Sequence, residues 1–304
     1  MKLLQIGRLR KTGGFERLLV SLFLLGLFLP ISHPGFAQAG ELASEWVRGH
    51  ASSVRLVAGR QIGVADGAAH SGIVAGVVIE LDDGWKTYWR NPGEAGGVPP
   101  DFNFSKSVNV ASAKVLYPAP KRLSDQTGDT IGYKHSVVFP VLVTPAKASE
   151  PVAINLEFAF GVCADICVPA EASMSLEVPA NVSEKVPEEV LEAMDHVPRA
   201  IDARRQGDPK LVSFKADLES KSPRIDFDVA FPGGAEHGDL FVTSPDGLYV
   251  PMAKRAAGKG GQEQSARFVV DLRDAFELDE LKGKKLTLTM VGPEGQSQRE
   301  IDLK

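Results

Sequence analysis

Cys163 and Cys167 are the only two cysteines among the 304 residues, and they lie four positions apart. A disulfide between them would close almost no loop in the unfolded chain, so it would add little to fold stability. In an oxidising compartment the pair can form a disulfide, and a strained disulfide in a short loop tends to be exchangeable. The spacing therefore predicts a redox-active pair.

Two other interpretations of the pair are an inert surface disulfide and ligation of copper or zinc. Two cysteines cannot complete a four-ligand zinc site, and the six histidines show no ligand spacing. Covalent haem attachment needs CxxCH, whereas three residues separate these cysteines and Val168 follows the second. We therefore expect neither a metal nor another cofactor. Asp165 lies between the cysteines, and its negative charge should raise a thiol pKa, which suits a carrier that stays quiet until a partner docks.

Short alternating apolar runs surround the cysteine pair. Residues 153–160 and 173–178 alternate as strands do, which places the pair in a loop between two strands. Similar runs occupy residues 53–56, 71–81 and 136–144, broken by Gly, Pro, Asn and Asp. This spacing predicts an all-β protein that begins with an immunoglobulin-like β-sandwich.

Residues 84–97 are rich in aromatic and glycine residues. On a strand, one face would carry Trp85, Thr87 and Trp89, and the other would carry Lys86, Tyr88 and Arg90. The favoured interpretation is a core tryptophan followed by a Gly/Pro turn, and the alternative is a platform that stacks a ligand or carbohydrate. Tyr88 and Arg90 are candidates for a docking surface.

The chain divides into two β-rich parts around one helical stretch. Residues 187–196 carry proline and glutamates at the start and a proline just beyond the end, which is typical of a helix. We expect a first domain at residues 40–180, a helical connector at 181–208, and a smaller β-rich domain at 209–304. Strands are expected at residues 211–218, 224–231, 239–243, 267–272 and 285–291.

The first 39 residues have the three parts of a secretory signal. Five basic residues precede an apolar run of 12 residues, and Ala37-Gln38-Ala39 provides a small-residue cleavage site. A span across the hydrocarbon core needs about 20 residues, so the run is too short for an anchor. Export, with cleavage near Ala39, is the prediction. The net charge of −5, without a basic cluster, argues against nucleic acid as a partner.

Three stretches resemble the N-terminal periplasmic domain family of the thiol:disulfide interchange protein DsbD, and more closely its ScsB (suppressor of copper sensitivity) relatives. They are residues 84–100 (GWKTYWRNPGEAGGVPP), 117–133 (YPAPKRLSDQTGDTIGY) and 158–172 (FAFGVCADICVPAEA). The resemblance implies an immunoglobulin-like domain in the periplasm. In the family, such a domain takes electrons from a membrane-embedded thiol carrier and passes them to periplasmic thioredoxin-like proteins.

The resemblance also assigns roles to residues. Cys167 matches the cysteine that forms mixed disulfides, and Cys163 matches the one that resolves them. DsbD has a longer segment between its cysteines and shields them with a cap loop that carries a phenylalanine. The corresponding residues 128–134 offer Ile131 and Tyr133 as possible cap or docking residues.

These observations predict a component of a protein-disulfide reductase, in which Cys163 and Cys167 pass reducing equivalents to partner proteins. The alternative is a non-catalytic β-sandwich that binds a protein or copper, with the disulfide only stiffening one loop. The family resemblance makes a link to copper tolerance a further expectation.

Overall fold

The computed structural model describes residues 42–65, 68–125, 128–183, 185–256, 264–273 and 278–303. The predicted export signal, residues 1–39, lies outside the described residues. Residues Ala39–Lys304 belong to one compact unit. Within the described ranges, no helix is long and apolar enough to cross a membrane.

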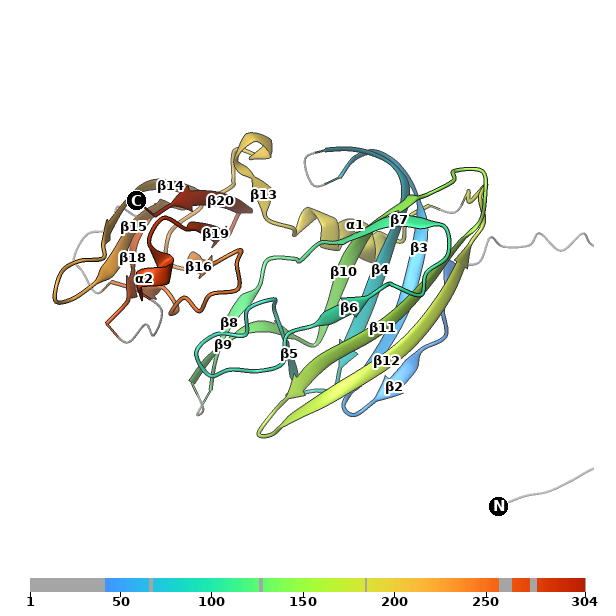
Figure 1. The fold of residues 1–304 in the computed structure, drawn as a ribbon, viewed down its shortest axis with the longest axis horizontal. Coiled ribbons are helices and arrows are strands. Elements are labelled where there is room, and N and C mark those ends of the chain that lie inside the picture. The colour runs from blue at the N-terminus through green and yellow to red at the C-terminus, as the bar shows by residue number, and fades with distance from the viewer. Residues whose placement is uncertain are drawn as a thin grey trace, which may run out of the picture. The chain divides into compact units, whose positions relative to one another are not determined.

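Two six-stranded sheets pack face to face and form the first sandwich. In spatial order, the first sheet contains β1 (Leu42–Ala43), β3 (Ser52–Ala65), β4 (Ala68–Leu81), β10 (Ser136–Pro145) and β7 (Val110–Val115), with β2 (Val47–Gly49) also paired to β3. The second contains β12 (Cys167–Val178), β11 (Val152–Cys163), β5 (Lys86–Tyr88), β9 (Gly128–Lys134) and β8 (Lys121–Asp125), with β6 (Asp101–Asn103) also paired to β11. The prediction of an all-β, immunoglobulin-like fold is confirmed (Figure 1).

Alternation along β11 shows how the sequence builds this sandwich. Its even-numbered residues from Val152 to Phe160 are buried, and the odd-numbered residues between them are partly exposed. A strand with one face on a core has this period of two. The buried face packs into a cluster that contains Trp89 and Phe139, which confirms Trp89 as a core tryptophan.

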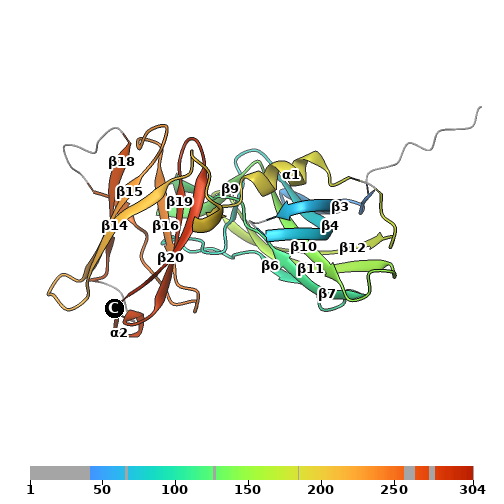
Figure 2. The same cartoon turned by 90° about the horizontal axis from the view of Figure 1, so that it is seen from above.

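The helix α1 (Glu188–Asp195) closes the outer face of the first sheet (Figure 2). Val190 is fully buried and lies over Gly76 of β4, where an added Cβ would come within 2.6 Å of the valine. Glu189 also forms an ion pair with Arg55 of β3, at 3.1 Å. The predicted helix is confirmed, with Pro187 at its N-cap.

Two four-stranded sheets form the second sandwich around a separate apolar cluster. One contains β13 (Arg199–Ala200), β20 (Gln296–Asp302), β19 (Lys285–Val291) and β16 (Asp239–Thr243), and the other contains β14 (Lys210–Asp217), β15 (Arg224–Ala230), β18 (Ser265–Asp271) and β17 (Lys254–Arg255). A 3₁₀ turn, η1 (Ile201–Ala203), and a short helix, α2 (Leu278–Leu281), complete the elements. The five strands expected after residue 209 are present, and β17 and β20 are further strands that the sequence did not predict.

Side chains from the second sandwich complete the core of the first. Phe241 and Met252 belong to the same buried cluster as Trp89, and the Trp89 and Phe241 rings lie 5.9 Å apart. Arg122 of β8 donates two hydrogen bonds to the Asp239 carboxylate, at 3.0 and 2.9 Å. Apolar packing and a bidentate ion pair therefore join the two sandwiches.

Candidate redox site

The two cysteines end the longest hairpin of the second sheet. Strands β11 and β12 pair without interruption from Val152 opposite Val178 to Cys163 opposite Cys167. A disulfide joins the cysteines, whose Cα atoms lie 4.2 Å apart. The expected loop placement is thus corrected: the cysteines are the last residue of β11 and the first of β12, and only residues 164–166 form the turn.

The two sulfurs differ in their access to solvent. Cys163 is fully buried, whereas Cys167 is exposed. Ile166, next to Cys167 in the turn, is 63% exposed. Asp165 is also exposed in the turn. A partner can therefore reach Cys167 directly, while Cys163 is accessible mainly to Cys167.

Tyr88 lies beneath the disulfide and contacts both sulfurs. Its strand β5 pairs with β11, with Lys86 opposite Cys163, so Lys86, Tyr88 and Cys163 share one face of the sheet. The Tyr88 hydroxyl donates to Cys163 Sγ at 2.6 Å and lies 3.1 Å from Cys167 Sγ. Sequence alternation made Tyr88 a candidate for a docking surface. At 1% exposure it is instead a buried hydrogen-bonding partner of the sulfurs.

Two glycines enclose the Tyr88 ring. A Cβ added to Gly97 would lie 2.3 Å from two ring carbons, and one added to Gly161 would lie 3.1 Å from a third. Gly97 also has a φ of +145°, a region that side chains disfavour. The backbone thus approaches the ring closely enough to fix where the hydroxyl points.

The surroundings of Tyr88 keep its hydroxyl protonated. Burial raises the pKa of Tyr88 above its usual value, and the negative charge of Asp125 raises it further. Both effects disfavour the phenolate. At neutral pH the hydroxyl can therefore donate a hydrogen bond to a cysteine sulfur, and a thiolate accepts such a bond more strongly than a neutral group does.

A buried lysine lies beside the pair on the same face. Lys86 is 5% exposed, and its Nζ donates to Asp125 at 2.5 Å and to the Thr130 hydroxyl at 3.1 Å. Buried charges are stable when they are paired and hydrogen-bonded in this way. Strand alternation put Lys86 on the face of Tyr88, but nothing in the sequence indicated its partners, which lie 39 and 44 residues further on.

The structure corrects the expectation for Ile131 and Tyr133. Residues 128–134 form strand β9, and both side chains belong to the core of the first sandwich, at 3% and 7% exposure. The Tyr133 hydroxyl donates to the Pro118 carbonyl at 2.8 Å. Buried side chains in a central strand cannot present a cap or a docking surface to solvent.

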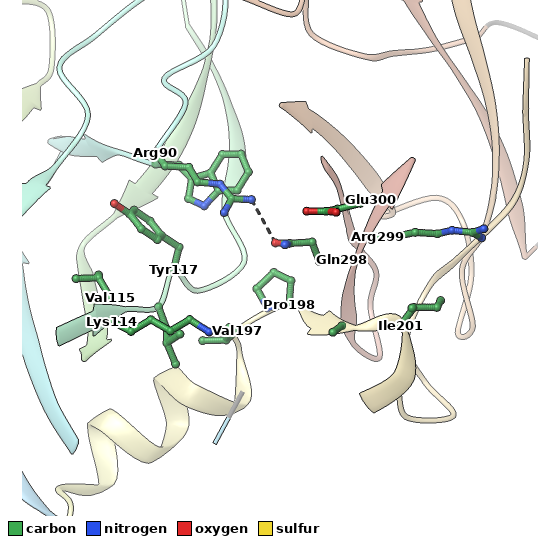
Figure 3. Close-up of a pocket in the computed structure, with 13 residues that line it drawn as sticks. Arg90, Lys114, Val115, Tyr117, Val197, Pro198, Ile201, Gln298, Arg299 and Glu300 are labelled. Carbon is green, nitrogen blue, oxygen red and sulfur yellow. Dashed lines mark hydrogen bonds between the residues drawn. The ribbon is translucent and has the colours of Figure 1, made fainter. Parts of the chain in front are cut away.

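Arg90 contacts the second sandwich. Its guanidinium lies 4.5 Å from the centre of the Trp89 ring and donates to Gln298 at 3.2 Å. It also lines a pocket of about 530 Å³ together with Lys114, Tyr117 and residues 298–300 (Figure 3). Neither cysteine lines this pocket. Arg90, a docking candidate from the sequence, is exposed and also contacts the second sandwich.

No candidate metal centre accompanies the pair: in the described ranges, no three residues among His, Cys, Asp and Glu cluster closely enough to hold an ion. The reactive groups at this site are thus the disulfide, the Tyr88 hydroxyl and the Lys86–Asp125 pair. Such a set can carry out thiol–disulfide exchange.

Comparison with known proteins agrees with this chemistry. Residues 53–179 match the family model for the N-terminal region of the thiol:disulfide interchange protein DsbD. The N-terminal periplasmic domain of ScsB from Proteus mirabilis shares the fold, with a TM-score of 0.63 and 21% identity over 87% of this chain and 99% of the other. Bovine butyrophilin, at 13% identity over 76% of this chain and 91% of its own, has a TM-score of only 0.21 and supports no argument.

No curated protein matches the chain. The family match covers both cysteines, Tyr88 and the Lys86–Asp125 pair. The resemblance noted from the sequence is therefore confirmed for the first sandwich. Residues 53–179 match the N-terminal domain family of the thiol:disulfide interchange protein DsbD, as the sequence resemblance predicted.

Proposed function

We propose that Cys163 and Cys167 cycle between dithiol and disulfide in the periplasm and pass electrons from a membrane-embedded thiol carrier to thioredoxin-like proteins. The observation that carries this proposal is the asymmetry of the pair. Cys167 is exposed and Cys163 fully buried, yet the strand register holds them opposite each other. The Cys167 sulfur is thus available to partner proteins, and the Cys163 sulfur is available to Cys167.

Electron delivery would take two exchange steps. The Cys167 thiolate attacks a partner disulfide, so a Cys167–partner bond forms and the first partner sulfur leaves as a thiolate. The Cys163 thiolate then attacks Cys167 Sγ, which re-forms the Cys163–Cys167 disulfide and releases the second partner thiolate. The partner gains two electrons and this pair loses two. Exchange with the carrier dithiol, by the same steps in reverse, restores the reduced pair.

Tyr88 would assist the step in which Cys163 acts. Its hydroxyl, 2.6 Å from Cys163 Sγ, can stabilise negative charge on that sulfur when the thiolate forms or leaves. The exposed Ile166 supplies an apolar contact beside Cys167 for a docking partner. These two side chains support the assignment of Cys167 to exchange and Cys163 to resolution.

The export signal and the division into domains belong to the same proposal. The basic and apolar pattern of residues 1–39 supports export with cleavage near Ala39. The first two sheets use residues 42–178, which supports a first domain at 40–180. Helix α1 lies in the proposed connector 181–208, but β13 (Arg199–Ala200) already pairs in a sheet of the second domain, proposed at 209–304.

The test is to trap mixed disulfides in cells that express Cys163→Ser or Cys167→Ser. Cys163→Ser should accumulate complexes, because the thiol that would displace the partner is absent. Cys167→Ser should accumulate few. Cells are quenched with acid, free thiols are blocked, and non-reducing gels are probed for this protein.

Equal trapping by both variants would refute the division of roles. Absence of any thiol-dependent complex from Cys163→Ser, at normal expression, would refute the exchange function. It would favour the alternative of a binding module with a structural disulfide.

A further inference from the structure

Residues 91–98 connect the second sandwich to the redox site. At one end of this loop, both carboxylate oxygens of Glu94 engage the second sandwich. Oε1 accepts from the Met252 backbone N–H at 3.2 Å, and Oε2 lies 3.2 Å from Lys254 Nζ. In return, Met252 Sδ accepts from the Glu94 N–H at 3.4 Å. Met252 is 6% exposed, whereas Glu94 and Lys254 lie at the surface.

The other end of the same loop lies against Tyr88. Gly97 packs directly on the ring, with no room for a Cβ. The Val98 carbonyl accepts from the Gly161 N–H at 3.0 Å, which holds the loop beside β11 close to Cys163. Only two residues separate Glu94 from Gly97, so a shift of one moves the other.

The first sandwich also holds the loop through backbone hydrogen bonds. Ala95 N–H donates to the Asp129 carbonyl at 3.2 Å, and Pro92 accepts from Ile131 N–H at 2.8 Å. The side-chain contacts of Glu94 are made to the second sandwich. Glu94 is thus the point at which that sandwich can influence the loop without altering the strands that carry the cysteines.

We propose that Glu94 is a positioning residue through which the second sandwich holds Tyr88 against the two sulfurs and thereby sets the reactivity of the cysteine pair. This inference rests on the redox function proposed above and gives the second sandwich a role in it. The physical link is the hydroxyl of Tyr88. A hydrogen bond to a thiolate favours the charged form, so a firmly held hydroxyl makes the sulfur more acidic.

The test measures the acidity of one sulfur in the full-length chain. In the Cys163→Ser background, Cys167 is the only cysteine, and Tyr88 oxygen lies 3.1 Å from its sulfur. The rate of alkylation by iodoacetamide against pH then gives one midpoint. We expect Tyr88→Phe to raise the midpoint by about 1 pH unit, a tenfold change in proton affinity. Glu94→Ala should raise it in the same direction.

The decisive comparison is the double variant. If Glu94 acts through Tyr88, then Glu94→Ala in the Tyr88→Phe background adds no further shift, since residues that act as one unit are not additive. Gln298→Ala is the matched control, because it removes another hydrogen bond between the sandwiches, to Arg90, without touching the loop. That control should leave the midpoint unchanged.

A second variant guards against simple loss of folding. Glu94→Gln keeps an oxygen for Met252 N–H and loses the ion pair with Lys254, whose side chain is 66% exposed. Exposed ion pairs contribute little, so this variant should behave nearly as the parent does. An intact tryptophan emission spectrum for each variant shows that the first sandwich has folded.

Three results would overturn the inference: no shift from Glu94→Ala, an equal shift in the Gln298→Ala control, or a shift from Glu94→Ala that persists undiminished without the Tyr88 hydroxyl. These measurements use a small alkylating probe and need no partner. They therefore stand apart from the trapping experiment, and the positioning role can fail while the exchange function holds.

Discussion

Reduction of the Cys163–Cys167 disulfide should change the stability of the first sandwich only slightly. The bridge joins residues four positions apart, so it closes a loop of about five residues in the unfolded chain. For such a loop, the chain-entropy model gives about 7 cal/mol/K, or about 2 kcal/mol at 25 °C. The paired strands β11 and β12 place the cysteines opposite each other in the folded state. We therefore expect a loss of no more than about 2 kcal/mol, which is a fall in Tm of less than about 8 °C.

The three tryptophans make this measurement specific. Trp46, Trp85 and Trp89 are the only tryptophans in the chain, and all lie in the first sandwich. Urea unfolding followed by tryptophan emission, with and without a phosphine reductant, reports on that sandwich and on its contact with Phe241. A Cys163→Ser/Cys167→Ser double variant is the control, and its midpoint should not respond to reductant.

A loss well above about 4 kcal/mol would refute the reasoning, because it would make the bridge a main support of the fold. A lower urea m-value after reduction would refute the assumption that the hairpin stays paired in the reduced protein. It would mean that the hairpin opens in the native state, so that less surface remains to be exposed on unfolding.

Three further outcomes can be measured on the same protein. Gly97→Ala should destabilise the first sandwich by about 1–3 kcal/mol in urea unfolding, because the new methyl group would overlap the Tyr88 ring; unchanged stability would contradict the close contact. Asp165→Asn should speed alkylation of Cys167 in the reduced protein by roughly twofold to threefold at low salt, because it removes an exposed negative charge next to the thiolate. That difference should shrink in 1 M salt. Intact-mass analysis of exported protein should show a chain that starts at or near Gly40, and a mass that includes residues 1–39 would contradict cleavage.

Local patterns in the sequence predicted the parts of the site that depend on neighbouring residues. The period of two along residues 152–160 predicted β11, and the same alternation put Tyr88 on the face opposite Trp89. Family resemblance supplied the roles of the cysteines. What the sequence could not provide was the contact between Tyr88 and the sulfurs, because it depends on how the three-residue strand β5 pairs with β11, 75 positions away.

The predictions that failed also depend on strand pairing between distant residues. Ile131 and Tyr133 were expected in a cap because the resemblance aligned residues 128–134 with a loop, whereas pairing with β5 and β8 makes them a central strand. Strand β20 was missed because its sequence, QSQREID, has few apolar residues. It pairs along its whole length with β19, so partner pairing outweighs its weak intrinsic pattern.

The uninterrupted pairing of β11 with β12 has a kinetic consequence. Because the register keeps the Cys163 and Cys167 backbones adjacent, 4.2 Å apart at Cα, reduction does not free the two thiols to separate. In the exchange mechanism proposed above, Cys163 would attack the Cys167–partner bond from a fixed neighbouring position, and such intramolecular reactions behave as though the attacking group were present at very high concentration. Complexes of the wild-type protein with its partners should therefore be short-lived. The protein would release each partner quickly, and its throughput would be limited by how often partners arrive.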